Sequence, residues 1–159
     1  MRRSSLTLTA ALLGAALVLP AAPAFALDAA YRVEGKSSPA ALWERIGDFC
    51  GVARWHPAVE SCALSAQDGA TVRTLALKGG GVIVEKLESR DEAGRSYSYS
   101  IVSAPLPVRD YLSVISVVPA GSGSAVVWRG SFDAQGVSDA EAVRTMEGVY
   151  KAGADELVK

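Results

Sequence analysis

The stretch that decides the fold is "SDAEAVRTMEGVYKAGADELV", Ser138 to Val158. Ser138 and, three residues later, Glu141 form a capping box, which marks the start of a helix. The apolar residues that follow recur on one helical face: Ala142, Val143, Met146, Val149, Tyr150, Gly153 and Leu157. This pattern predicts a long amphipathic helix that ends near Val158, and its apolar face requires a large packing partner.

A series of strand-like runs before this helix can supply that partner. Apolar and polar residues alternate in residues 62–67, 71–78, 82–91, 95–103, 110–119 and 124–134. Turn-forming residues separate the runs, among them three glycines at 79–81 and the segment "APLPV" at 104–108. Short and regular connections of this kind predict hairpins, and therefore an antiparallel sheet.

One further strand and two short helices are predicted nearer the N-terminus. Residues 29–37, "AAYRVEGKS", alternate like a half-buried strand. Residues 37–49 open with two serines that can cap a helix and with Pro39 in its first turn, and one more helical turn is predicted at 51–55. The predicted fold class is α+β, with a curved antiparallel sheet of six to seven strands wrapped around the long C-terminal helix.

The first 26 residues, "MRRSSLTLTAALLGAALVLPAAPAFA", have the features of a secretory signal. Arg2 and Arg3 precede an apolar run that is too short to span a bilayer comfortably, and "AFA" supplies the small residues of a cleavage site. We predict a signal peptide, residues 1–26, cleaved after Ala26; the alternative is an uncleaved N-terminal anchor. Residues 27–159 then form a single domain that is periplasmic or secreted.

The charge balance excludes several classes of partner. The formal net charge is −1, and removal of Arg2 and Arg3 with the signal peptide makes it −3. No basic run follows, so neither nucleic acid nor an anionic membrane surface is an expected partner. No second long apolar stretch occurs either, so stable membrane insertion is not expected.

The segment "DFCGVARWHPAVESC", residues 48–62, holds both cysteines and the one histidine of the chain. In an oxidising compartment Cys50 and Cys62 are expected to form a disulfide; the alternative is two separate buried thiols. No metal site is expected, because such sites need three or four ligands and His56 has too few partners in the sequence. His56 itself is interpreted as a residue that forms hydrogen bonds at the cavity edge, or alternatively as a functional residue.

Glu85 is the first candidate for chemistry. In "VIVEKLES" it shares one strand face with Ile83 and Leu87, and alternation alone leaves both orientations open. If Glu85 points inward, burial is expected to raise its pKa and to make it a usable acid or ligand-binding group. The alternative is a solvated carboxylate beside Lys86.

Three further strand faces carry polar groups that suit a pocket wall. Tyr97, Tyr99 and Ile101 share one face, Tyr111 and Ser113 share another, and Trp128 lies on a third. If these faces point to the long helix, they line one pocket; the alternative is a filled core in which the tyrosines only pack. Leu106 and Val108 lie in the proline-rich loop, which is expected to cover the pocket mouth or to be an ordinary rigid hairpin loop. Arg109 is a further polar candidate there.

Four phrases resemble one superfamily: "IGDFCGVARWHPAVESC", "VEKLESRD", "YSYSIVSAPLPVRDY" and "EGVYKAGADEL". Together with the element order, they are similar to the bacterial polyketide cyclase/dehydrase branch of the START and birch-pollen-allergen-like superfamily, called SRPBCC. The resemblance implies a helix-grip fold with an apolar cavity between the sheet and the long helix. Likeness to the plant abscisic-acid receptors implies two loops over its mouth, residues 78–81 and 103–111.

In the cavity that the resemblance implies, the strand faces, the proline-rich loop and the apolar face of the long helix nominate the lining residues: Ile83, Glu85, Tyr97, Tyr99, Ile101, Leu106, Val108, Tyr111, Ser113, Trp128, Val143, Met146 and Tyr150. The expected function is binding or carriage of a small hydrophobic molecule, such as a lipid, a polyketide-like compound or an aromatic compound, without a cofactor. One alternative is a cyclase/dehydrase-like enzyme with Glu85 and Tyr111 as candidate catalytic residues. Another is an accessory protein that binds a periplasmic protein partner.

Overall fold

The computed structural model describes residues 26–159, so the predicted signal peptide lies, apart from its last residue, outside the described residues. These residues form seven strands: β1 (Leu27–Gly35), β2 (Val59–Gln67), β3 (Ala70–Leu77), β4 (Val82–Asp91), β5 (Ser96–Ser103), β6 (Val108–Ala120) and β7 (Gly123–Ala134). The helices are α1 (Pro39–Ile46), α2 (Val52–Trp55) and α3 (Asp139–Leu157). The predicted α+β class and the element order are confirmed.

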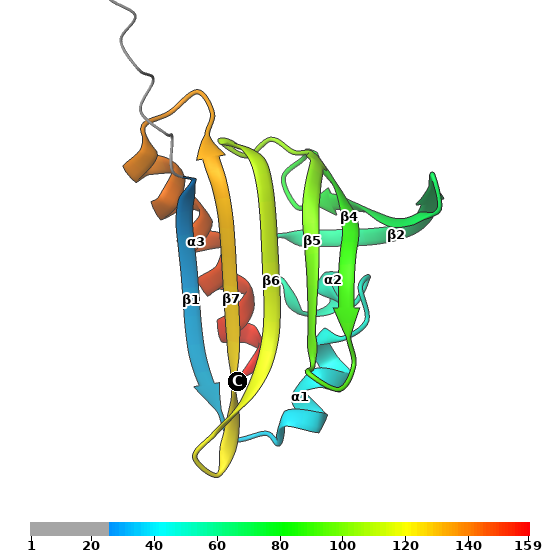
Figure 1. The fold of residues 1–159 in the computed structure, drawn as a ribbon, viewed down its shortest axis with the longest axis vertical. Coiled ribbons are helices and arrows are strands. Elements are labelled where there is room, and N and C mark those ends of the chain that lie inside the picture. Colours follow the sequence, from blue (N-terminus) through cyan, green and yellow to red (C-terminus); the bar gives the residue numbers. More distant parts are fainter. Residues whose placement is uncertain (1–25) are drawn as a thin grey trace, which may run out of the picture.

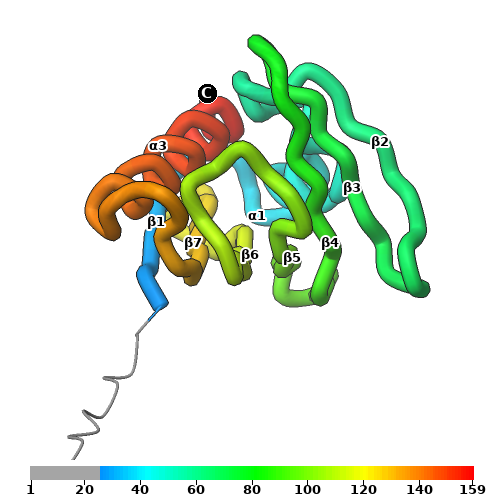
Figure 2. Tube along the Cα trace, turned by 90° about the horizontal axis from the view of Figure 1, so that it is seen from above, coloured from blue at the N-terminus to red at the C-terminus, as the bar shows by residue number. Residues whose placement is uncertain are grey.

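All seven strands belong to one antiparallel sheet with the order β1-β7-β6-β5-β4-β3-β2 (Figure 1). Strands β2 to β7 follow one another as hairpins, and β1 pairs with β7 at the opposite edge. Seen from above, the sheet bends around α3 and α1, which lie on its concave side (Figure 2). The architecture is the helix-grip fold that the sequence predicts.

Helix α3 begins as the capping box predicts, because the Ser138 hydroxyl accepts the Glu141 backbone N–H at 3.3 Å. Its buried face consists of Ala142, Met146, Tyr150, Gly153, Ala154 and Leu157. Gly153 allows α3 to approach the end of α2 closely, since a Cβ atom at this position would lie 2.5 Å from the ring of His56, which follows α2. The helix thereby contacts both the sheet and the α2 region.

Helix α1 closes one end of the concave side. Ser38 caps it and Pro39 is its first residue, as predicted, and Leu42 and Ile46 are completely buried. The Arg45 guanidinium donates to the backbone oxygen of Leu157 at 2.6 Å, which ties α1 to the last turn of α3. Both short helices therefore face the same interior as α3.

Candidate functional site

A cavity of about 140 Å³ lies between the sheet, the α2 segment and α3. Most of its wall is apolar, with a few polar side chains among the aliphatic ones. The lining residues are Val52, His56, Ala58, Val59, Arg73, Leu75, Leu77, Ile83, Glu85, Tyr99, Ile101, Leu106, Tyr111, Trp128, Met146 and Val149. An apolar wall with a small number of fixed polar groups is typical of sites for small molecules.

The structure brings together eight of the residues that the sequence nominates for a cavity. They come from four strands, one loop and α3: Ile83, Glu85, Tyr99, Ile101, Leu106, Tyr111, Trp128 and Met146. Glu85 points inward and is 6% exposed, so the alternative of a solvated carboxylate is wrong. The inward faces of β4, β5, β6 and β7 thus meet at one place, which is one of the arrangements that alternation allows.

Five other nominated residues lie outside the cavity wall: Tyr97, Val108, Ser113, Val143 and Tyr150. Tyr97 is on the inner face, but Phe49 covers it edge-on with ring centroids 5.6 Å apart. Ser113 lies behind the Trp128 indole, whose N–H donates to the Ser113 hydroxyl at 3.0 Å. Alternation shows which side chains share one face of a strand, whereas the side chains of neighbouring elements decide which part of the inward face remains open.

The Tyr150 hydroxyl bonds to the Tyr111 hydroxyl at 2.7 Å, so it supports the wall from behind. Val108 is buried at the start of β6, and Val143 lies on the half-buried flank of α3. Arg109, the other polar candidate, forms exposed ion pairs with Asp110 and Asp133. The side chains that do not line the cavity are thus Tyr150, Val108, Val143 and Arg109.

A buried ion pair forms the charged part of the cavity wall. Arg73 and Glu85 are directly opposite on β3 and β4, and Arg73 Nε donates to Glu85 Oε2 at 2.5 Å. The Arg73 Nη1 group donates to the backbone oxygen of Phe49. The Arg73 guanidinium carbon also lies 4.1 Å from the centre of the Phe49 ring and 4.9 Å from that of Tyr99, in cation–π geometry.

Each member of this pair changes the acidity of the other. Burial raises the pKa of Glu85 above its ordinary value, and the adjacent guanidinium of Arg73 opposes that rise. Burial alone would lower the pKa of Arg73, but the Glu85 carboxylate outweighs it and raises that pKa. Because the guanidinium stays charged, the two groups form an ion pair, and Glu85 is engaged rather than free to transfer protons.

A second polar group of the wall consists of hydroxyls around the Trp128 indole. The indole N–H donates to the hydroxyls of Tyr99 and Ser113, both at 3.0 Å. Burial raises the pKa of Tyr99 and Tyr111, and it raises the pKa of Tyr150 to about 12. These tyrosines therefore remain protonated and act as hydrogen-bonding groups rather than as bases.

His56 lies at the edge of the cavity in a neutral form fixed by two hydrogen bonds. Its Nδ1 accepts the Ala58 backbone N–H at 3.2 Å, so Nε2 carries the proton and donates to the Val149 backbone oxygen, also at 3.2 Å. Burial lowers the pKa of His56, and the positive charge of Arg73 lowers it further. The interpretation of His56 as a residue that forms hydrogen bonds at the cavity edge agrees with this geometry.

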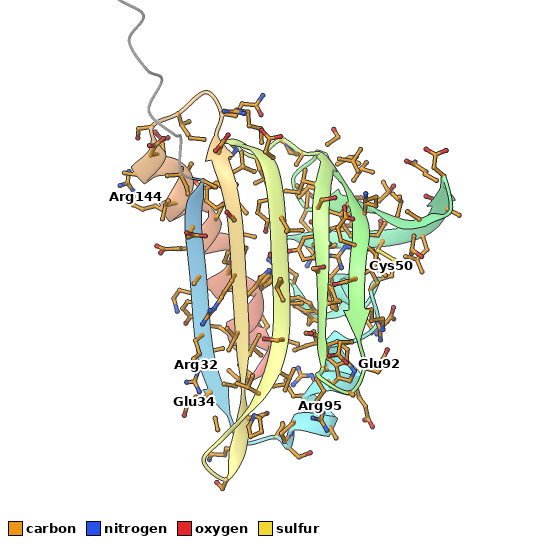
Figure 3. The ribbon with its side chains drawn as sticks, in the orientation of Figure 1. Arg32, Glu34, Cys50, Glu92, Arg95 and Arg144 are labelled. Atoms are coloured by element: carbon orange, nitrogen blue, oxygen red, sulfur yellow. A yellow bond between two sulfur atoms is a disulfide. The ribbon has the colours of Figure 1, made fainter. Side chains whose placement is uncertain are left out.

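The structure joins Cys50 to Cys62, as the sequence predicts, with their Cα atoms 5.5 Å apart. The bond connects the loop before α2 to the edge strand β2, beside which Cys50 is labelled in Figure 3. Val52 and His56, which line the cavity, lie within the closed loop. In residues 26–159 no cluster of three or more His, Cys, Asp or Glu side chains has an arrangement that could hold a metal ion.

Two loops meet at the expected mouth of the cavity. Gly79, Gly80 and Gly81 have φ angles of 91°, 100° and 100°, a region that favours glycine. A Cβ atom at Gly81 would lie 3.4 Å from the Pro105 ring, so the turn after β3 and the loop after β5 touch each other. Leu106 of the second loop lines the cavity.

Arg73 is the main site residue that the sequence analysis missed. A positive charge within a strand is usually solvated, and Val72 beside it is buried as well, so alternation gave no signal. The position of the turn could have indicated this pair. Arg73 and Glu85 are equally distant in sequence from Gly79 at the turn, so a hairpin places them opposite each other. Six apolar lining residues were not predicted either; they lie in α2, the loop before β2, β2, β3 and α3: Val52, Ala58, Val59, Leu75, Leu77 and Val149.

The comparisons with known proteins agree with this fold and with this element order. Residues 28–159 match the family model described as polyketide cyclase/dehydrase and lipid transport. A search of curated proteins found no significant match. The solved structure of XoxI from Bacillus cereus is 36% identical with a TM-score of 0.76, and the match covers 83% of this chain and 93% of XoxI.

Two further solved structures extend the comparison. An uncharacterised protein from Bacillus thuringiensis is 36% identical with a TM-score of 0.76, over 82% of this chain and 96% of that protein. The Zhui aromatase/cyclase from a Streptomyces species is 17% identical with a TM-score of 0.66, over 84% and 92%, and shows likeness of fold alone. The match over residues 28–159 decides the family: the chain belongs to the polyketide cyclase/dehydrase and lipid transport family of the SRPBCC superfamily.

Proposed function

We propose that this protein is an exported binding protein that carries a small hydrophobic molecule in the cavity beneath α3. The observation that carries the proposal is the apolar cavity of about 140 Å³, into which polar groups project from only a few positions. Cavities of about this size lined by aliphatic and aromatic side chains take up molecules such as benzene. The expected ligand is therefore about one ring in size unless the two mouth loops move apart.

The proposed export is supported by two independent features. The N-terminal segment has the charge, apolar run and small residues of a signal peptide. The disulfide between Cys50 and Cys62 is typical of proteins that fold in an oxidising compartment. No helix within residues 26–159 combines the length and the apolarity that a bilayer crossing demands.

Binding explains the site better than a cyclase/dehydrase reaction does. General acid–base catalysis needs a group that can release or accept a proton near neutral pH. Glu85 is held by Arg73 at 2.5 Å, and burial raises the pKa of Tyr111, the other candidate, well above its ordinary value. If no small molecule binds, the remaining hypothesis is an accessory protein that binds another protein.

The test is a titration of the 15N-labelled protein, residues 27–159, with toluene, followed by NMR. We expect saturable shifts at amides around the cavity, such as those of Ile83 and Met146. The variant Ile83→Trp fills the cavity and should abolish the shifts, whereas Val114→Trp, on an exposed position of β6, should retain them. Absence of saturable shifts in the unsubstituted protein would refute the binding proposal.

A further inference from the structure

The charges on the cavity wall cancel each other. Arg73 and Glu85 are the charged residues among those that line the cavity, and they neutralise each other at 2.5 Å. The imidazole ring of His56, which also lines the cavity, is held neutral by its two hydrogen bonds. A ligand in the cavity therefore meets dipoles and hydrogen-bonding groups, but no uncompensated charge.

Both members of the ion pair have hydrogen-bonding capacity beyond the bond that joins them. The hydrogen bonds within residues 26–159 engage Nε and Nη1 of Arg73 and Oε2 of Glu85. Both groups have further hydrogen-bonding capacity, because a guanidinium carries five N–H donors and a carboxylate has about four acceptor sites. Both side chains line the cavity, with side-chain exposed fractions of 2% for Arg73 and 7% for Glu85. The pair thus offers a donor and an acceptor beside each other.

A charged ligand would lose its hydration in this cavity without gaining an opposite charge. An anion would meet the Glu85 carboxylate as well as Arg73, and a cation would meet Arg73 as well as Glu85. Removal of an ion from water is strongly unfavourable unless a partner compensates for it. A neutral ligand with a hydroxyl or an amide group instead satisfies the free donor and acceptor at little cost.

We infer that the cavity selects an uncharged, one-ring molecule that carries a hydroxyl or amide group, which the Arg73–Glu85 pair recognises. This inference rests on the proposed binding function and specifies its ligand class. The size of the cavity sets the one-ring limit, and the balanced ion pair sets the charge. The hydroxyls of Tyr99 and Tyr111 lie on the same wall and complete the polar environment of the ligand.

The test is a set of one-ring ligands of similar size that differ in charge: benzamide, benzyl alcohol, toluene, benzoate and benzylammonium. Dissociation constants are measured by NMR titration of residues 27–159 at neutral pH. We expect benzamide and benzyl alcohol to bind most tightly, toluene next, and both ions roughly a hundredfold more weakly than benzamide. Benzoate that binds as tightly as benzamide would overturn the inference, and the binding function would stand.

A charge-switch variant sharpens the test. Glu85→Gln leaves the Arg73 charge unbalanced, so benzoate should bind at least about tenfold more tightly than it does to the unsubstituted protein. The matched control is Glu88→Gln on the same strand, where Glu88 is exposed and pairs with Lys86, and it should change none of the affinities. A folded Glu85→Gln variant without a gain for benzoate would contradict the role of the pair.

The outcomes separate the two proposals. If none of the five ligands binds, toluene included, the binding function itself fails. If Glu85→Gln does not fold, which its circular dichroism spectrum reveals, the ligand series on the unsubstituted protein decides alone. Preference for the neutral polar ligands supports the inference, and equal affinity for all five overturns it while the cavity remains a binding site.

Discussion

Two parts of the same sheet differ in how closely their inner side chains pack on the concave side. Along β1, β7 and β6, which lie beside α3 (Figure 1), most inner side chains are closely packed, and only Tyr111 and Trp128 of these strands reach the cavity. Ile115, Val126 and Phe132 are completely buried there. Where β3, β4 and β5 curve away, the wall carries Arg73 and Glu85 and borders the cavity. One part is an ordinary close-packed core, and the other leaves space beside a buried ion pair.

The two parts contribute differently to the stability of the fold and to the recognition of a ligand. The filled part packs α3 against the sheet, and removal of side-chain volume there lowers the stability of the protein. The open part gives up packing contacts and buries two charges, both of which cost stability. We therefore expect substitutions in the two parts to differ in how much they lower the free energy of unfolding.

The largest expected effect is that of Arg73→Met, which leaves the Glu85 carboxylate buried without its partner. The free energy of unfolding should fall by about 3–5 kcal/mol, measured by urea denaturation. The double variant Arg73→Met/Glu85→Leu should recover much of that loss, because it removes both charges. A double variant as unstable as the single one would show that the ion pair matters for the packing around Phe49 rather than for charge balance.

A slightly smaller effect is expected from Phe132→Ala in the filled part of the sheet. Phe132 is completely buried and stacks on Tyr111 with ring centroids 6.1 Å apart, so its removal leaves a cavity and should cost about 3–4 kcal/mol. Leu77→Ala, in the open part, should cost only about 1 kcal/mol, since Leu77 is half-buried and already borders a cavity. Equal losses in urea denaturation would remove the distinction between the two parts.

The smallest expected effect is a pH dependence that comes from His56. Its pKa is lowered in the folded state, so the unfolded chain binds more protons, and the contribution of His56 is full above about pH 6.5 and lost as the pH falls below that value. Protonation also breaks the bond from the Ala58 N–H, worth about 1 kcal/mol.

The measurement compares the unsubstituted protein with His56→Gln, by urea denaturation at about pH 7.5 and about pH 5.5. The stability difference between the two proteins should shrink at the lower pH. The comparison cancels the carboxylates, including Glu85, whose raised pKa acts in the opposite direction. A difference that stays constant with pH would show that His56 does not titrate in this range.

Local patterns predicted most of the fold. The capping residues Ser138 and Ser38 start the helices where the sequence places them, and the long helix ends within one residue of the predicted Val158. The alternation of the strands gave the hairpin order, because each pattern depends only on neighbouring residues. The inward direction of Glu85 needed the structure, since alternation leaves both faces possible.

The site was less predictable, for a physical reason. The shape of a cavity depends on side chains that meet from distant parts of the chain, such as Phe49 over Tyr97 and Tyr150 behind Tyr111. Neither strand alternation nor the apolar helix face carries information on those encounters, so Tyr97 and Tyr150 lie on the inner side of the fold but not among the residues that line the cavity. Arg73 escaped notice because its partner is adjacent only across a hairpin.

The bond between Cys50 and Cys62 has a consequence for when the protein becomes competent to bind. It closes the segment that carries Val52 and His56, two parts of the cavity wall. Under the proposed export, this bond forms only after the chain has left the reducing cytoplasm. We therefore expect the precursor to be unable to retain a ligand at its site of synthesis, so that loading follows secretion and samples only molecules present outside the cytoplasm.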